Sequence, residues 1–360
     1  MLTTPQYDST QTIGNSRSPR IAVVIPARNE ASFIGGSVTS LLQQSCIDGL
    51  QVFVVDDNSS DGTAEAVRCA SSHSAHGRRA SVINGRPLPP GWSGKLWAVQ
   101  QGIEQAAQLS PDFFLFTDAD IEHAPDNIAR LVAIAQDGGY DLASFMVKLH
   151  CRNLVEKLLI PAFVFFFLLL YPPRWIRDPR RKAAGAAGGC ILIRPAALER
   201  AGGIEAIRHE IIDDCALARA VKRTGGRVWL GLAADTRSMR AYNSFAEVES
   251  MIARTAFNQL RHSIWLLLAT VLAMLIVFVL PLALLASGSP LPAAIGGIAY
   301  LLLTATYFPM VRFYRLNSLW ALTLPFSAVF YVGATVHSAF KYWSGRGGEW
   351  KGRTQDAANQ

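Results

Sequence analysis

The sequence predicts an α/β fold with a mostly parallel, doubly wound sheet, followed by helices that cross a membrane. Two features of the chain lead to this prediction. Short β-branched or aromatic runs alternate with helix-like segments in the first half, and long uncharged runs follow Ser263. With 50% hydrophobic and only 17% charged residues among 360, the chain is too apolar to be soluble throughout. We therefore expect one soluble domain and one membrane portion.

The soluble part opens with alternating strands and helices. The expected strands span residues 21–26, 52–55, 80–84 and 113–117, and the expected helices span 30–44, 61–70 and 94–108. Such alternation produces a mostly parallel sheet, and ligands bind beyond the carboxyl ends of its strands. Polar clusters at three of these ends, residues 27–30, 56–63 and 118–120, predict a binding site along this edge.

Asp118 and Asp120 flank one small residue at the end of the run FFLFT. Two carboxylates at a strand end can share a divalent cation, Mg²⁺ or Mn²⁺, that also holds a diphosphate. The alternative is that they form a turn or cap a helix. Their position after a buried strand favours the metal site.

The run DDNSSDGT at residues 56–63 has two interpretations. Asp61 or Ser60 can cap the following helix. A carboxylate at the strand end can also accept the imide hydrogen of a uracil-like base, while loop N–H groups face the ligand. Both interpretations can hold at once.

An ordered set of motifs extends from residue 21 to about residue 230. In chain order these are PARNE (26–30), DDNSSDGT (56–63), WSGKLWAVQQG (92–102), DAD (118–120), GGCILIRP (188–195) and IDD (212–214). Each is loose alone, but the ordered set resembles the family 2 glycosyltransferases of the GT-A fold, which is Rossmann-like with a mostly parallel sheet. The GWSGKLWA variant and the C-terminal membrane region are most similar to the bacterial hopanoid (hopene) biosynthesis-associated glycosyltransferases, with ceramide glucosyltransferases more distantly similar.

The resemblance implies a role for each matching position. It places Pro26, Ala27, Arg28 and Glu30 beside the donor nucleotide, Asp57 on its base, Lys95 near the base or phosphates, and Asp118 with Asp120 at the metal and the diphosphate. Asp214 falls where the family carries its general base. Because the family usually shows Glu-Asp where this chain has Asp213-Asp214, the choice between the two acids stays open. Both can instead cap the helix expected over residues 216–223.

The implied activity is an inverting transfer of a sugar from a nucleotide sugar, expected to be UDP-linked, to a lipid hydroxyl such as that of a hopanoid. Such a transfer needs a carboxylate that takes the acceptor proton and a metal that stabilises the departing diphosphate. An alternative acceptor is a polyprenyl phosphate, which is already anionic and needs no strong base. An alternative of another class is a non-catalytic membrane scaffold, against which the intact acids at 57, 118, 120 and 214 argue.

Four further residues are candidates for the acceptor or donor-sugar region. Gly188 and Gly189 can admit a close approach of either substrate, although glycine pairs also serve tight turns. Gln259 and Arg261 lie in NQLRH, which weakly resembles the QxxRW element of processive members, with histidine in place of tryptophan. Processive synthesis is therefore not expected. His123, just after DAD, is interpreted as a solvated loop residue.

Three C-terminal stretches are long and apolar enough to span a bilayer: residues 264–286, 291–310 and 319–340. Arg312 and Arg315 put the link between the second and third stretches in the cytosol, together with the catalytic domain. Three full spans would leave the basic tail outside. We therefore expect two to three spans, with the last segment, interrupted at Pro325, re-entrant or interfacial.

The apolar run LLIPAFVFFFLLLY at residues 158–171 lies between DAD and Asp214. A full crossing there would separate the metal site from the base, so we expect a membrane-surface element near residues 155–175. A buried core helix is the alternative. Cations that can meet lipid headgroups follow this run: Arg174, Arg177, Arg180, Arg181 and Lys182.

These observations divide the chain into an N-terminal tail (1–19), a glycosyltransferase domain (20–262), a membrane region (263–342) and a basic, cytosolic or interfacial tail (343–360). The first twenty residues lack the apolar core of a signal peptide. The net charge of +7 matches lipid headgroups better than nucleic acid, which is not expected as a partner. The expected location is the bacterial inner membrane, with the catalytic domain in the cytosol and with a nucleotide sugar and a lipid as substrates.

Overall fold

The computed structural model describes residues 18–45, 49–72, 80–345, 349–350 and 353–354. The chain divides into two compact units. Unit 1 comprises Met1–Leu149, Tyr171–Arg240 and Trp350–Gln360, and unit 2 comprises His150–Leu170 and Ala241–Glu349. Most of the two predicted tails, 1–19 and 343–360, lies outside the described residues. The domain limits predicted from the sequence stay a prediction.

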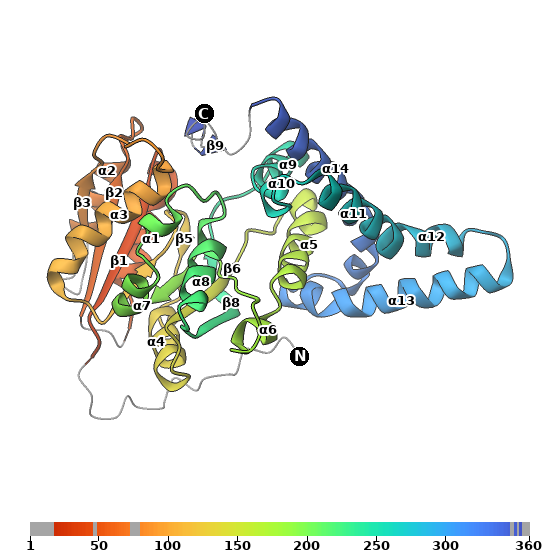
Figure 1. The fold of residues 1–360 in the computed structure, drawn as a ribbon, viewed down its shortest axis with the longest axis horizontal. Coiled ribbons are helices and arrows are strands. Elements are labelled where there is room, and N and C mark those ends of the chain that lie inside the picture. The colour runs from red at the N-terminus through yellow and green to blue at the C-terminus, as the bar shows by residue number, and fades with distance from the viewer. Residues whose placement is uncertain (1–17, 46–48, 73–79, 346–348, 351–352, 355–360) are drawn as a thin grey trace. The chain divides into compact units, whose positions relative to one another are not determined.

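Unit 1 is built on one eight-stranded sheet with the strand order β3-β2-β1-β4-β7-β6-β8-β5; strands β1, β2 and β3 at one end of this order can be followed in Figure 1. Its strands are β1 (Ile21–Ala27), β2 (Leu50–Asp56), β3 (Ala80–Asn84), β4 (Phe113–Phe116), β5 (Ile121–Glu122), β6 (Leu142–Lys148), β7 (Ile191–Ile193) and β8 (Val228–Ser238). Neighbours β1, β2, β3 and β4 pair in parallel, as do β6 and β8. Strand β7 runs antiparallel to both β4 and β6, and β5 runs antiparallel to β8. The predicted α/β class with a mostly parallel sheet is confirmed.

Helices connect these strands because the chain must return to begin each parallel strand. The helices of unit 1 are α1 (Ala31–Leu42), α2 (Thr63–Ser72), α3 (Gly94–Ala106), α4 (Asn127–Asp137), α6 (Pro173–Arg177), α7 (Pro195–Arg200) and α8 (Asp213–Arg223), with short 3₁₀ turns at Ala107–Leu109 and Glu205–Ile207. Strand β1 is buried along its whole length and lies in the middle of the core. The side chain of Ser93 caps α3 by accepting a hydrogen bond from the N–H of Leu96 at 3.3 Å, which fixes where this helix begins.

Unit 2 is helical. Its elements are α5 (Leu154–Leu170), α9 (Phe245–Ala253), α10 (Ala256–Gln259), α11 (Ile264–Met274), a π-helical turn (Leu275–Val279), α12 (Leu280–Leu285), α13 (Pro290–Phe313), a 3₁₀ turn (Ser318–Thr323) and α14 (Leu324–Trp343). Helices α12 and α13 form a hairpin (Figure 1). A two-stranded ribbon of β9 (Glu349–Trp350) and β10 (Arg353–Thr354) follows in the chain.

Four helical segments of the described residues are long and apolar enough to cross a membrane. They are Leu154–Arg177, Ile264–Leu285, Pro290–Phe313 and Ser318–Trp343. The last three correspond to the three predicted spans. The expected interruption at Pro325 falls beside a change of helix type, because a 3₁₀ turn ends at Thr323 and α14 begins at Leu324 with this proline in its first turn. A re-entrant or interfacial position of this segment stays a prediction.

Helix α5, which forms most of the segment Leu154–Arg177, packs within unit 2. The Ser327 hydroxyl donates to the Leu158 carbonyl at 2.8 Å, and the Tyr331 hydroxyl donates to the Leu159 carbonyl at 3.0 Å. The C-terminal end of α5 is exposed to solvent, since Leu169 and Leu170 are 57% and 59% exposed. The helix is thus partly a core element and partly an exposed apolar surface, and its predicted position at a membrane surface stays a prediction.

Candidate active site

One pocket in unit 1 gathers residues from five of the predicted motifs. It lies where β1 and β4 end, beside the first turns of α3 and α8. Its lining consists of Pro26, Lys95, Leu96, Val99, Phe116, Thr117, Asp118, Gly188, Ile191, Ile204, Ile207, Asp213, Asp214 and Leu217. A cluster of charged groups therefore lies against an apolar wall at the carboxyl edge of the sheet, where the sequence predicts the binding site.

Lys95 is the cation of this cluster. Its Nζ lies 3.0 Å from Oδ1 of Asp118 and 3.1 Å from Oδ2 of Asp213. Burial alone would lower the pKa of the ammonium group, but the negative charges of Asp118, Asp213 and Asp214 outweigh burial and raise its pKa above the ordinary value. Lys95 is therefore charged at physiological pH. It holds together the carboxylate of Asp118, which follows a strand, and that of Asp213, which begins a helix.

Asp214 lies in the first turn of α8, and both of its carboxylate oxygens accept backbone hydrogen bonds. The N–H of Gly188 donates to Oδ2 at 2.9 Å, and the N–H of Cys215 donates to Oδ1 at 2.6 Å. Burial raises the pKa of Asp214 to about 6, with the charge of Asp213 acting in the same direction and Lys95 and the two N–H groups opposing it. The carboxyl can therefore exchange a proton near neutral pH. The alternative role as a helix cap is not observed, because the N-cap residue of α8 is Ile212 and no side chain caps it, although both acids lie in the first turn, where negative charge is favourable.

Gly188 brings backbone against these charged groups. A Cβ at this position would lie 3.4 Å from Nζ of Lys95 and 3.6 Å from carboxylate oxygens of Asp118 and Asp214. Any side chain here would occupy the space among the three charged groups. The position thus fits the predicted close approach of a substrate.

Gly189 differs from its neighbour. A Cβ there would lie 2.8 Å from Cγ2 of Val147, and the Gly189 carbonyl accepts a hydrogen bond from the Thr117 hydroxyl at 2.7 Å. This glycine is required for packing. Its predicted role beside the acceptor stays a prediction.

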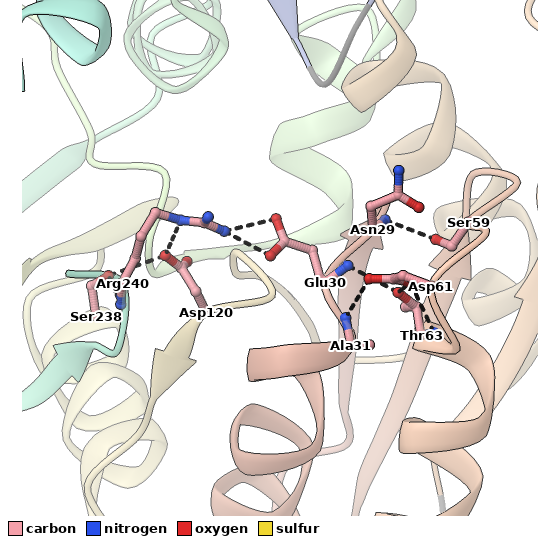
Figure 2. Close-up of polar contacts among 9 residues, drawn as sticks. All are labelled: Asn29, Glu30, Ala31, Ser59, Asp61, Thr63, Asp120, Ser238 and Arg240. Carbon is pink, nitrogen blue, oxygen red and sulfur yellow. Dashed lines mark hydrogen bonds and ion pairs between the residues drawn. The ribbon is translucent and has the colours of Figure 1, made fainter. Parts of the chain in front are cut away.

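A second polar cluster, shown in Figure 2, surrounds Arg240. The Arg240 guanidinium donates to Oδ2 of Asp120 at 3.0 Å and to both carboxylate oxygens of Glu30 at 2.8 and 2.6 Å. The Ser238 hydroxyl also donates to Oδ2 of Asp120, at 3.1 Å. Arg240 therefore joins two of the predicted site residues, one following β1 and one following β4.

The sequence offers no signal for Arg240. It matches none of the motifs, and it lies 120 residues after Asp120. The two meet because β5 pairs antiparallel with β8, so that Ile121 lies opposite Ser238. Only knowledge of this long-range pairing would have placed Arg240 in the site.

Asp118 and Asp120 present a donor set that fits a divalent cation. Burial is the main cause that raises the pKa of Asp120. The negative charge of Asp118 raises it further, and the positive charge of Arg240 opposes the shift. The two carboxylates are thus close enough to repel each other, a repulsion that a cation would relieve. No group of three or more His, Cys, Asp or Glu side chains suited to a metal occurs among the described residues. A cation here would hence take carboxylates from the protein and the rest of its ligands from phosphate oxygens and water, as Mg²⁺ commonly does.

Arg28 and Asp57 lie together after β1 and β2. Nη1 of Arg28 donates to the Asp57 carbonyl at 2.6 Å and lies 3.5 Å from Oδ2 of Asp57. Ala27 is buried in the core. Asp61 accepts from the N–H of Ala31 at 3.0 Å and from the N–H of Thr63 at 3.1 Å, so its side chain binds backbone N–H groups at the starts of α1 and α2, in line with the capping interpretation (Figure 2).

His123 corrects the expectation of a solvated loop residue. It is only 3% exposed, and its ring nitrogens contact the Thr117 hydroxyl and the Asn127 amide, both at 3.0 Å. Burial lowers the pKa of the ring to about 3. The residue is a neutral core histidine, because the chain after DAD turns back into the sheet as β5. Gln259 and Arg261 belong to unit 2, and their predicted role stays a prediction.

Comparison with known proteins agrees with this site. Residues 22–202, half of the chain, match the family model described as Glycosyl transferase family 2. The undecaprenyl-phosphate 4-deoxy-4-formamido-L-arabinose transferase of Yersinia enterocolitica is 29% identical over 136 residues, which are 37% of this chain and 38% of that protein. The protein of the same description from Pseudomonas savastanoi pv. phaseolicola is 30% identical over 128 residues, 34% of each chain. The matched region thus spans little more than a third of either relative.

The solved structures show the same fold over more of the chain. A mannosyltransferase from Pyrobaculum calidifontis, in complex with GDP-Man and Mn²⁺, has a TM-score of 0.58 and 20% identity, covering 90% of this chain and 88% of that chain. This likeness confirms the GT-A fold. Together with the family match over half of the sequence, it shows that the chain belongs to glycosyl transferase family 2 and is a glycosyltransferase.

Proposed function

We propose that this enzyme transfers a sugar from a nucleotide diphosphate sugar to a polyprenyl phosphate in the membrane. The main support for a sugar-transfer reaction is one pocket whose lining includes the charged side chains of Lys95, Asp118, Asp213 and Asp214. The acceptor class is supported by the relatives, whose printed names are undecaprenyl-phosphate sugar transferases. The apolar helices of unit 2 suit an enzyme whose substrate lies in a bilayer.

The donor would lie along the carboxyl edge of the sheet. Asp57 and Arg28 would contact the base, which we expect to be uracil, and Lys95 would contact the phosphates. Asp118 and Asp120 would hold the divalent cation. When bound, this ion neutralises the charge that develops on the departing diphosphate. Lys95 contributes a second positive charge on the same side.

The transfer is a single displacement. A phosphate oxygen of the acceptor forms a bond to the anomeric carbon while the bond from that carbon to the donor diphosphate breaks, and the nucleoside diphosphate leaves with the electron pair. An ionised phosphate has no proton to lose, so this acceptor needs no general base. Asp214 would then position Gly188 and balance the charge of Lys95.

A hopanoid hydroxyl is the second candidate acceptor, and one observation favours it. Asp214 has a pKa of about 6, in the range that suits a general base near neutral pH. A hydroxyl acceptor would require such a base. The two candidates therefore differ in what they require of Asp214. A non-catalytic scaffold is not favoured, because every predicted acid of the site is present in the fold.

The acceptor can be identified with membranes that contain the protein. Radiolabelled UDP-, GDP- and dTDP-sugars are supplied with undecaprenyl phosphate or with a hydroxylated hopanoid, with and without EDTA. We expect EDTA-sensitive label in the polyprenyl lipid, which mild acid releases because the product is a glycosyl phosphate. Acid-stable label in the hopanoid would contradict the proposed acceptor, and no labelled lipid from any donor would contradict the proposed transfer.

Asp214→Asn separates the two acceptors. With a phosphate acceptor we expect the variant to retain transfer within about tenfold of wild type, because no proton is removed. With a hydroxyl acceptor the loss would be roughly 10²- to 10⁴-fold, the usual contribution of a general base. Donor binding, measured by equilibrium dialysis, should be unchanged in both cases.

The active site constrains how the chain meets the membrane. Asp118 and Asp214 line the same pocket, so both lie on one side of any bilayer. The chain between them includes Leu154–Leu170, and this helix therefore makes no net crossing. We propose that it enters and leaves at the cytosolic face of the bacterial inner membrane, where nucleotide sugars are available.

Arg240 is expected to act on the metal through Asp120. Replacing a residue that orients a metal-binding carboxylate typically weakens metal binding by 10- to 100-fold. We expect Arg240→Met to weaken Mn²⁺ binding by about this factor, and Arg240→Lys to recover part of the loss because it restores the charge without the contacts to both acids. Isothermal titration of Mn²⁺ with the purified protein measures both variants. Unchanged Mn²⁺ affinity in Arg240→Met would contradict this role.

A further inference from the structure

The Lys222 side chain lies in a cage of backbone carbonyls at the end of α8. Its Nζ donates to the carbonyls of Ile176 at 2.7 Å, Ala183 at 2.7 Å, Asp178 at 3.1 Å and Trp175 at 3.3 Å. An ammonium group has three protons, so all of them are used and one is shared. One side chain therefore fixes the path of the chain from residue 175 to residue 183.

The chain that Lys222 fixes carries a strongly basic surface, which we call the basic segment. Its members are Arg174, Trp175, Arg177, Arg180, Arg181 and Lys182, all of them exposed. Asp178 is the one acid among residues 174–182. The tryptophan is 49% exposed, and the Arg181 guanidinium lies 4.7 Å from the centre of its ring. An exposed tryptophan among cations is the side-chain combination of proteins that sit at the headgroup level of a bilayer.

Residues 183–188, which we call the strap, are all alanine or glycine and lead from the basic segment to the active site along α8. The Ala183 carbonyl is bound by Lys222, the Ala186 carbonyl accepts from Sγ of Cys215 at 3.5 Å, and the N–H of Gly188 donates to Asp214 at 2.9 Å. The strap is thus tied to both ends of the same helix. A contact that fixes the position of the basic segment therefore also constrains Gly188, which lines the pocket.

We propose that the basic segment is a preformed docking surface for the anionic headgroups of a phospholipid bilayer, and that Lys222 is the positioning residue that holds it in shape. Three observations carry the proposal. Five cations face solvent with one acid, and an aromatic side chain is exposed among them. In sequence the segment follows the apolar helix α5, and its first residues belong to the stretch Leu154–Arg177, which is long and apolar enough to cross a membrane. Fixing the backbone beforehand removes an ordering cost when the surface binds. The proposal concerns membrane contact and does not depend on which acceptor the enzyme uses.

The test uses the full-length protein in nanodiscs of phosphatidylcholine alone or of phosphatidylcholine mixed with phosphatidylglycerol. Trypsin cleavage after Arg177 and Lys182 is followed by mass spectrometry, with cleavage after the exposed Arg200 as the internal reference. We expect cleavage in the basic segment to be roughly tenfold slower with the anionic lipid, and this protection to disappear at high ionic strength. Equal cleavage in both lipids would overturn the proposal, as would equal protection by free inorganic phosphate in neutral nanodiscs.

Two variants separate charge from shape. Arg180→Glu/Arg181→Glu should lose the protection, whereas Arg68→Glu/Arg223→Glu, with the same change of net charge at two other exposed arginines of unit 1, should keep it. Lys222→Met leaves every cation of the basic segment in place. We expect it to raise cleavage in both lipids and to remove the difference between them, with cleavage after Arg200 unchanged. Full protection in Lys222→Met would show that charge alone suffices and would overturn the role of Lys222.

Discussion

Asp118→Asn is expected to lower sugar transfer by roughly a hundred- to a thousandfold, the usual cost of removing one charge-stabilising group from a transition state. The change keeps the shape of the side chain but removes the charge that faces both Lys95 and the proposed cation. The metal dependence provides a second readout. Because the variant should bind Mn²⁺ weakly, raising the metal concentration should recover part of the activity. Initial rates at increasing Mn²⁺ with a fixed donor measure both effects.

Asp137→Asn is the matched control for this prediction. Asp137 is an exposed acid at the end of α4, outside the pocket lining, and its replacement should leave rate and metal dependence unchanged. If Asp118→Asn retained full activity at the same low metal concentration as wild type, Asp118 would not be a metal ligand. Wild-type transfer that persisted in EDTA would contradict the metal itself.

The active-site edge could be predicted because its signals are local. Asp118 follows a buried strand, Lys95 begins a capped helix, and Asp213 with Asp214 begins another helix. In a parallel sheet, strand ends and helix starts meet at one edge. Sequence order and spacing are therefore sufficient to expect these side chains near one another, and the structure places them around one pocket.

Features that depend on long-range pairing could not be predicted in the same way. The short strand β7 lies between β4 and β6 and runs antiparallel to both, although nothing in the run ILI indicates direction. Arg240 enters the site only through the pairing of β5 with β8. Lys222, at the end of an amphipathic helix, has the sequence signature of an ordinary surface lysine. The carbonyls that bind it belong to residues 39 to 47 positions earlier in the chain.

The membrane segments illustrate a different limit. Length and apolar composition identify helices that can cross a bilayer, and all three C-terminal predictions are recovered as long helices. Composition does not distinguish a crossing from a helix that packs on its own unit, as α5 does through Ser327 and Tyr331. For that helix the stronger constraint comes from the pocket, since residues on either side of it in the chain line the same site.

The pH dependence of stability should report the burial of Asp214. The ordinary pKa of an aspartate is 3.8, and that of Asp214 in the folded chain is about 6, mainly because of burial. Between these two values the folded state binds more protons than the unfolded state, so the contribution of Asp214 to stability is fully present below about pH 4 and is lost as the pH rises through about 6. Each unit of pH in this window changes the free energy of unfolding by at most about 1.4 kcal/mol.

This sign can be tested by comparing wild type with Asp214→Asn in EDTA. Asparagine does not titrate, so the variant lacks the pH-dependent contribution of this carboxyl, and its altered hydrogen bonds with Gly188 and Cys215 add an offset. The stability of wild type relative to the variant should therefore increase as the pH falls from about 7 to about 4. Urea unfolding of the detergent-solubilised protein at several pH values measures the difference, with Asp137→Asn as the control for the loss of one carboxylate. A difference that stays constant, or that decreases toward low pH, would show that Asp214 is not held as a buried acid. An increase would mean that the enzyme retains at neutral pH a buried charged group that costs it stability, as expected for a carboxylate that balances the charge of Lys95 and holds Gly188 in the pocket wall.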